Sequence, residues 1–243
     1  MPFTFCHPAA VLPFGLIRSR YISLSGLVIG SIIPDFEYFL RLKVLSTVSH
    51  SFAGVFLFDL PLGLLLYFVF HAVVREPFIS NLPGFLKKRL SGFEGPAWSG
   101  SLKLRLLVVS ASILFGVLTH LIWDGFTHKG GYFVVRSEFL QKDFGFFGYV
   151  VPAYKYAQHF SSLFGAIAII GVVYRMPVRC KETSNPEKRF WLWAGAVGVC
   201  LLLLNLAVNS SLNIGDIVVS GISGMLLGIF IASVKFPTER NGR

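Results

Sequence analysis

Long runs of apolar residues, separated by short polar and charged segments, make up most of the chain after residue 50. A helix needs about 20 mostly apolar residues to cross a bilayer. Five segments come close to this requirement, although the third is short and is expected to begin a few residues before its apolar run. The pattern predicts five transmembrane helices, at approximately Phe52–Val74, Leu104–Trp123, Phe160–Tyr174, Phe190–Val208 and Ile214–Val234.

The first 50 residues follow a different pattern. Two apolar runs, Ala9–Ile17 and Leu24–Ile33, are each too short to span a membrane, and Arg18 and Arg20 separate them. Such segments favour a re-entrant or interfacial helical hairpin, with a sixth span as the alternative. The predicted fold is an all-α membrane protein with a single domain over 1–243, made of an N-terminal helical hairpin (1–50) and a transmembrane bundle (51–235).

Composition supports a membrane location. Of the 243 residues, 54% are hydrophobic and only 14% are charged, whereas soluble domains carry about 25% charged residues. The net charge of +10 is attributed to loops that set membrane orientation. We therefore expect membrane lipid as a partner and no nucleic acid, because no basic stripe with interleaved aromatic residues occurs in a soluble segment.

The basic residues are distributed unevenly between the loops. The segments that follow the first, third and fifth predicted spans hold fourteen of the 22 basic residues, whereas 124–159 holds four. Because basic loops stay in the cytoplasm, the C-terminus is predicted to be cytoplasmic and 124–159 to face outward. His50, His120, Asp124 and His159 then lie at one outer face, which Asp35 can join, as can His7 if the hairpin is re-entrant.

The segment THLIWDGFTHKGG carries the densest candidate chemistry. His120 and Asp124 are four residues apart, which places both on one face of a helix, and paired ligands at this spacing hold zinc in other helices. His128 continues the same stripe, but about 12 Å further along a continuous helix. It is therefore expected to serve a second ion or the substrate, with Gly130 and Gly131 ending the helix.

Each of these residues also has a plain structural interpretation. An interfacial His or Asp often caps a helix or binds a neighbour, and Ser51 is the stronger candidate for the helix cap beside His50. Asp35 could be a turn residue, with Glu37 supplying a second carboxylate, and His159 could be a ligand, a substrate contact or a simple interfacial residue. The convergence of several ionisable groups at one membrane face favours a metal or polar active site.

Several segments together resemble a known family. MPFTFCHPAAVLPF, LVIGSIIPDFEYFLR, SHSFAGVFLFDLPLG, THLIWDGFTHKGG and VPAYKYAQHFSS, in this order, resemble the bacterial membrane family called domain-of-unknown-function family 4184 over approximately 1–235. The resemblance implies a membrane protein of unassigned activity.

A more distant similarity concerns the bacterial inner-membrane metal-dependent hydrolases, whose motifs are PDxDH, HRGxTHS and HxxxD. His7, Asp35, His50, His120 and Asp124 match that pattern, and Glu37 stands at the second aspartate. Tyr38 replaces the His of PDxDH, and no histidine stands at the first position of HRGxTHS. The resemblance thus implies enough ligands for one metal, with His128 and His159 as candidates to compensate.

These observations predict a metal-dependent hydrolase in the bacterial cytoplasmic (inner) membrane, with its site at the outer interface and a lipid or phosphoester as the substrate. A divalent metal, with zinc preferred, would be held by His7, Asp35, His50, His120 and Asp124. Glu37 or His128 would transfer protons. Lys129, Arg136 and His159 would contact the substrate, the two cations by orienting a phosphate or another anion.

Two other classes of function stay open. A non-catalytic scaffold, or a protein that binds a small molecule or an ion, would use the polar cluster only to join helix ends. A transporter would fit the charged, proline-broken helix around Asp59 and Pro61, but no second half of the chain repeats that break. The sequence gives no prediction of the oligomeric state.

Overall fold

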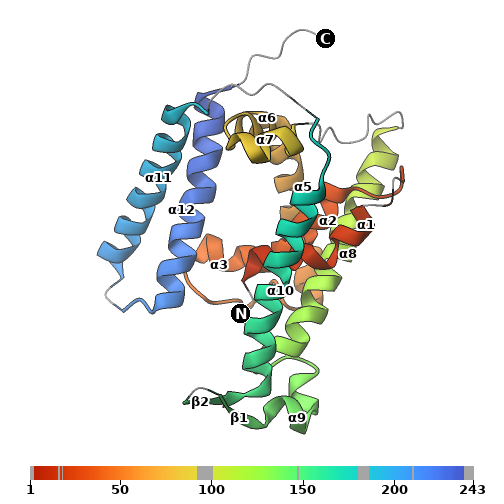
Figure 1. Cartoon of the computed structure of the whole chain (residues 1–243), viewed down its shortest axis with the longest axis vertical. Helices are drawn as coiled ribbons and strands as arrows, with labels where there is room; N and C mark the ends of the chain where they lie inside the picture. The colour runs from red at the N-terminus through yellow and green to blue at the C-terminus, as the bar shows by residue number, and fades with distance from the viewer. Residues whose placement is uncertain are drawn as a thin grey trace. The chain divides into compact units, whose positions relative to one another are not determined.

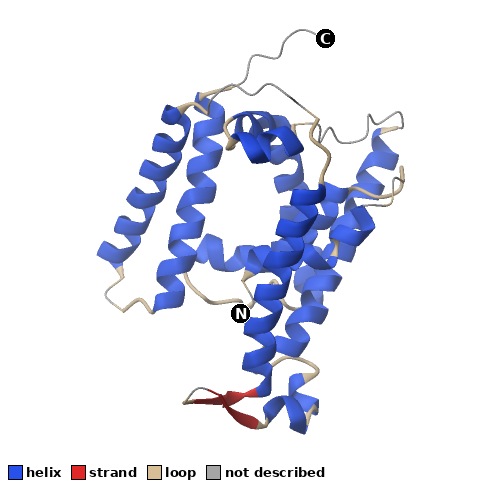
Figure 2. Cartoon of the chain, in the orientation of Figure 1, coloured by secondary structure: helices blue, strands red, loops and turns tan. Residues whose placement is uncertain are grey.

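The computed structural model describes residues 3–15, 17, 19–91, 101–146, 148–179, 186–209 and 211–237. The described chain is mostly helical, with one two-stranded β-hairpin (Figures 1 and 2). Five helices are long and apolar enough to cross a membrane, which confirms the five predicted spans. These are Phe52–Ser80, Leu102–Thr127, Ala153–Arg175, Lys188–Val208 and Ile214–Lys235.

The chain divides into two compact units. The first unit comprises Met1–Pro34, Ser49–Leu64 and Trp98–Arg175, and the second comprises Asp35–Val48, Leu65–Ala97 and Met176–Arg243. All six histidines except His71 belong to the first unit. The polar residues predicted to bind metal therefore lie almost entirely within one unit.

Helix α2 (Leu24–Ile32) packs against α8 (Leu102–Thr127) in the first unit. The Ser23 side chain caps α2, and the Ser23 main-chain N–H donates to the Ser112 hydroxyl on α8 at 3.0 Å. The two backbones touch because both helices have a glycine at the crossing: a Cβ on Gly30 would collide with the Ile113 carbonyl, and one on Gly116 would lie 2.6 Å from the Ser31 nitrogen. This crossing fixes α2 along α8.

The 3-10 helix η1 (Thr4–Ala10), which carries His7, packs against α10 (Ala153–Arg175). The Phe3 main-chain N–H donates to the Ser162 hydroxyl, and the Cys6 thiol donates to the Ser162 carbonyl, both at 3.0 Å. A four-residue helix, α1 (Leu12–Gly15), follows η1. The described helices before residue 50 are all too short to span a membrane, as the hairpin prediction requires.

The first span contains two π-helical turns. It runs through α4 (Phe52–Gly54), the π turn η3 (Val55–Asp59), α5 (Leu60–Val69), the π turn η4 (Phe70–Val74) and α6 (Arg75–Ser80). Ser51 caps its start by accepting from the Gly54 N–H, as predicted. Pro61 is the second residue of α5, just after η3 ends at Asp59, and a widened turn is one way in which a helix tolerates a residue that lacks an N–H.

The segment after α8 folds back on the end of that helix. The Phe133 N–H donates to the Gly125 carbonyl at 3.1 Å, and the Phe133 and Phe126 rings stack with centroids 3.9 Å apart. The chain then forms η5 (Val134–Arg136), α9 (Glu138–Gln141) and an antiparallel hairpin of β1 (Asp143–Phe146) and β2 (Tyr149–Pro152), which leads into α10. The hydrophobic pattern of the sequence did not predict this hairpin.

In the second unit, α11 (Lys188–Val208) and α12 (Ile214–Lys235) lie side by side (Figure 1). Asn213 and Asp216 form a capping box at the start of α12. The short helix α3 (Phe36–Arg41) packs on α12, where the Ser223 hydroxyl lies 2.9 Å from the Phe39 carbonyl. The unit also contains α7 (Gly84–Leu90).

The close contact between α2 and α8 gives a stability prediction. Gly116→Ala forces α2 away from α8, because the added methyl group meets backbone atoms that cannot move independently, and we expect a loss of about 1–3 kcal/mol in the free energy of unfolding. The matched control is Gly171→Ala on α10, where a Cβ meets nothing within 4 Å. Thermal unfolding in detergent micelles measures both, and equal unfolding temperatures for Gly116→Ala and the wild type would contradict the prediction.

A candidate metal centre around Asp124

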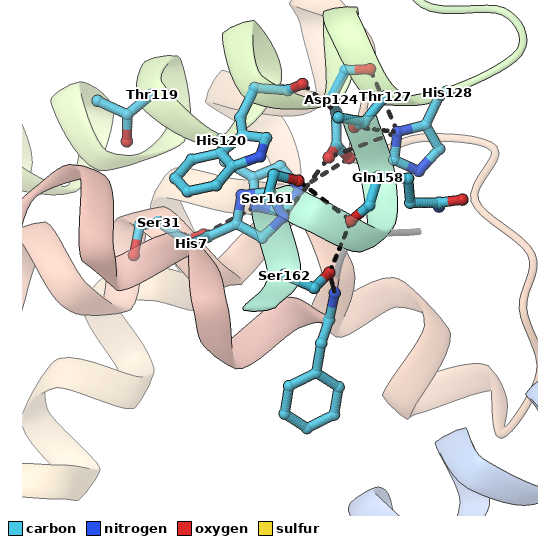
Figure 3. A network of polar contacts seen from close by, with 12 residues as sticks. His7, Ser31, Thr119, His120, Asp124, Thr127, His128, Gln158, Ser161 and Ser162 are labelled. Carbon is cyan, nitrogen blue, oxygen red and sulfur yellow. Dashed lines mark hydrogen bonds and ion pairs between the residues drawn. The ribbon is translucent and has the colours of Figure 1, made fainter. Parts of the chain in front are cut away.

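Four histidine rings surround the carboxylate of Asp124 in the first unit. Oδ2 lies 3.2 Å from Nε2 of His120 and 3.5 Å from Nε2 of His50. Oδ1 lies 3.5 Å from Nε2 of His7 and 3.4 Å from Nδ1 of His128. Figure 3 shows His7, His120 and His128 gathered about Asp124. Each carboxylate oxygen therefore faces two imidazole nitrogens.

His120 is held by the contact between α8 and α2. It is fully buried, and its Nδ1 lies 2.8 Å from the main-chain oxygen of Ser31 at the end of α2. A carbonyl oxygen can only accept, so Nδ1 carries the proton and donates. In the neutral ring, Nε2 then presents a lone pair, and this is the atom that lies 3.2 Å from Asp124 Oδ2.

Two acceptor atoms that face each other in a buried site repel unless a cation lies between them. A second proton on His120 would supply that cation, and so would a metal ion. A histidine that binds metal through one nitrogen usually donates its other N–H to a carbonyl or a carboxylate. The His120 hydrogen bond to Ser31 matches this pattern.

His7 approaches the same carboxylate from η1. Its side chain is buried, its ring stacks on His120 with centroids 3.9 Å apart, and neither of its ring nitrogens makes a hydrogen bond. Burial lowers the pKa of His7 to about 3, because apolar surroundings disfavour the charged ring, and the neighbouring His120 adds to this effect. His7 is thus a neutral ring, in which one nitrogen carries the proton and the other presents a lone pair that could bind a metal.

His50 and Asp35 complete a group with metal-binding geometry. One ligand atom from each of Asp35, His50, His120 and Asp124 lies within 4.8 Å of the others. Asp35 is buried. It is the last residue of the turn η2 (Ile33–Asp35), which continues α2 directly. It is also the first residue of the chain that is assigned to the second unit. These four residues could hold one metal ion, and all four are among the predicted ligands.

His128 lies beside Asp124, although it follows the end of α8. The prediction that the helix extends through His128 is wrong: α8 ends at Thr127, and His128 is extended, with φ −111° and ψ 145°. Its ring turns back, so that Nδ1 lies 3.2 Å from the Asp124 carbonyl. Burial lowers the pKa of His128.

Glu37 lies in a separate network in the second unit. Its carboxylate is buried and accepts hydrogen bonds from Arg41, from Ser46, from Thr47 and from the Val48 N–H, at 2.8–3.0 Å. These contacts tie the loop after α3 to that helix. They give Glu37 a structural explanation that the sequence did not reveal.

The three predicted substrate contacts are all exposed. Lys129 follows His128 directly, and His159 lies near the start of α10. Arg136 stacks on the Tyr132 ring at 3.8 Å and donates to the Tyr132 carbonyl at 3.0 Å. None of these arrangements tests a role in substrate binding, which stays a prediction.

Comparison with known proteins identifies the family of the chain. The chain matches the family model described as "Domain of unknown function (DUF4184)" over residues 1–234 and belongs to that family. No curated protein and no solved structure matches the chain. The protein is thus a multi-pass membrane protein of this family, with a buried His/Asp cluster that could bind metal, and its similarity to the hydrolases stays a prediction.

The buried neutral state of His7 predicts a pH dependence of stability. The pKa of His7 is about 3 in the folded chain and about 6.5 when exposed. Between these values the unfolded chain binds more protons, so the metal-free protein loses stability as the pH falls below about 6.5. Thermal unfolding at several pH values measures this loss.

His7→Gln should make that dependence on pH shallower, because the substituted side chain cannot take up the proton. The control is His159→Gln, at an exposed position on α10, which should retain the wild-type dependence. Identical dependences of stability on pH for wild type and His7→Gln would contradict the lowered pKa of His7 as the cause.

Proposed function

We propose that the cluster around Asp124 binds a divalent metal ion and that the protein is a metal-dependent hydrolase. The ligands of this ion are His120, His50, Asp124 through Oδ2, and Asp35. One observation carries the proposal: the lone pair of His120 Nε2, fixed by the hydrogen bond to Ser31, lies 3.2 Å from a carboxylate oxygen in a buried site. A cation between these two atoms turns a repulsion into two bonds.

The distances support metal ligation. Ligand atoms that bind one zinc ion at about 2.0–2.2 Å in a tetrahedron lie roughly 3.3–3.6 Å from each other. His50 Nε2 and His120 Nε2 lie 3.5 and 3.2 Å from Asp124 Oδ2, close to this range and at or beyond the long end of hydrogen-bond distances.

The donor types favour a first-row divalent metal. Two imidazoles and two carboxylates, without a thiolate, suit zinc and also iron, cobalt or manganese. The metal-binding part of the proposal therefore commits to a divalent cation, with zinc preferred.

The partial exposure of two histidine side chains in the cluster supports the hydrolytic part of the proposal. The side chains of His50 and His128 are 26% and 28% exposed, whereas those of His7, His120 and Asp124 are buried. A bound divalent cation would supply an acidified water and neutralise an anionic substrate. A substrate would enter beside the two partly exposed rings.

His128 is the proposed proton-transfer residue. Its Nδ1 lies 3.2 Å from the Asp124 carbonyl, which can only accept, so Nδ1 carries the proton and Nε2 keeps the lone pair. The lowered pKa keeps the ring neutral near pH 7 and thus able to accept a proton. We do not assign this task to Glu37, because hydrogen bonds in the second unit already occupy its carboxylate.

The site lies at the end of a membrane span, which favours a lipid or phosphoester substrate at the membrane interface. The exposed cations Lys129 and Arg136 follow in the same loop and can orient a phosphate. The uneven loop charge supports a cytoplasmic C-terminus and an outward-facing cluster in the bacterial cytoplasmic membrane.

Metal content tests the binding part of the proposal. We expect protein purified in detergent without chelator to contain zinc or another first-row metal. Asp124→Asn and His120→Gln should lower the content at least about 10-fold, since each removes a ligand. His71→Ala is the matched control, because His71 packs against Tyr67 in the second unit. Metal-free wild type, after reloading has been attempted, would overturn the proposal in favour of a structural role for the cluster.

Hydrolysis of a chromogenic phosphodiester in mixed micelles tests the catalytic part. We expect turnover that is lost on chelation and restored by zinc. His128→Gln should lower kcat by about 10²–10⁴-fold with unchanged metal content. The substitution removes the group that transfers the proton, but it removes none of the four proposed metal ligands. His71→Ala should retain wild-type turnover. A His128→Gln variant with wild-type kcat would refute the role of His128.

A further inference from the structure

We infer that Asp124 bridges two metal ions, and that His7 holds the second ion together with Oδ1 of Asp124. This inference rests on the proposed function, since it adds an ion to the same centre. The ligands proposed for the first ion include Oδ2 of Asp124, which leaves Oδ1 facing a different pair of rings.

The unsatisfied atoms on this side of the carboxylate point to a ligand. Asp124 Oδ1 is buried and makes no hydrogen bond, and the same is true of both ring nitrogens of His7. His7 Nε2 lies 3.5 Å from Oδ1, which is within the spacing of two atoms bound to one zinc ion, about 3.3–3.6 Å. A buried polar atom without a partner destabilises a fold, and a shared cation would give a partner to Oδ1 and to one ring nitrogen of His7.

The stacking of His7 on His120 sets the separation of the two ions. The ring centroids lie 3.9 Å apart and the rings are inclined by 21°. Their Nε2 atoms approach different oxygens of one carboxylate. Ions bound one to each ring would therefore lie about as far apart as the rings, and two-metal hydrolytic sites have a spacing of about 3.5–4 Å.

The two ions would differ in how many protein ligands they have. The first has four, from His120, His50, Asp124 and Asp35, whereas the second has His7 and Oδ1 of Asp124. The second ion thus keeps more positions open for water or for an anionic substrate oxygen, as a catalytic ion requires. It should also bind more weakly.

His7 is positioned for this role by contacts that do not involve the site. The Cys6 thiol donates to the Ser162 carbonyl, and a Cβ on Gly165 would lie 2.8 Å from that of Cys6, so η1 rests directly on α10. The Trp123 ring meets His7 edge-on with centroids 5.4 Å apart. These contacts hold the His7 ring against His120 before any ion binds.

Metal stoichiometry in the whole purified protein tests the inference. The protein is stripped with chelator, dialysed against Mn²⁺ or Zn²⁺ over a range of concentrations, and analysed for bound metal. We expect two ions per wild-type chain, the second at higher free metal, and about half that content in His7→Ala. Asp124→Asn should lose most of both ions, and His71→Ala should keep both. His7→Gln replaces His7→Ala if the latter fails to fold.

Each other outcome has a defined meaning. One ion in both wild type and His7→Ala overturns the second site and leaves the proposed function intact. No ion in the wild type overturns both. Loss of all metal in folded His7→Ala places His7 at the first ion and overturns a separate site.

Electron paramagnetic resonance of the Mn²⁺-loaded protein separates a bridged pair from two distant ions. Two Mn²⁺ ions bridged by one carboxylate interact, and we expect a spin-coupled spectrum in the wild type. The spectrum should change to that of isolated Mn²⁺ in His7→Ala. Two uncoupled ions in the wild type would overturn the shared carboxylate.

Discussion

The hydrogen bond from the His120 ring to the Ser31 carbonyl connects the polar cluster to the packing of the helices. It exists because Gly30 and Gly116 let α2 and α8 meet backbone to backbone. It also fixes which nitrogen of His120 faces Asp124. The electrostatics of the cluster therefore depend on how closely two apolar helices approach, and a shift of α2 along α8 would move the carbonyl away and release the ring.

The cluster concentrates ionisable groups where burial makes them costly. His7, His120 and Asp124 are buried at the end of a membrane span, and buried charges without partners weaken a fold strongly. Here each oxygen of one carboxylate faces two imidazole nitrogens, and a cation bound among them would compensate the negative charge. In the second unit, the Glu37 carboxylate is instead satisfied by the loop beside it, without histidines. The carboxylates of Asp124 and Glu37 thus have opposite surroundings, and of these two only Asp124 has the donor set of a metal site.

The sequence predicted the features that depend on local periodicity. The five spans follow from the lengths of apolar runs, and the pairing of His120 with Asp124 follows from their four-residue spacing. It could not predict the position of His128, which depends on where α8 ends, or the role of Glu37, whose partners come from the next loop. The Ser31 carbonyl was also missed, because a main-chain acceptor has no side-chain signature. The nearest signal was the pair of glycines inside apolar helices, which mark a close approach of backbones.

The close contact between α2 and α8 depends on backbone atoms that meet at two glycines, and none of these contacts requires an ion. The ligands on α8 and the end of α2 are consequently in place as soon as the helices have packed. Under the proposed function, insertion into the membrane and acquisition of metal are then separate events in the life of the protein. A cell short of metal would, under the same proposal, accumulate a folded, metal-free form that awaits loading, and would not need to degrade and remake the chain.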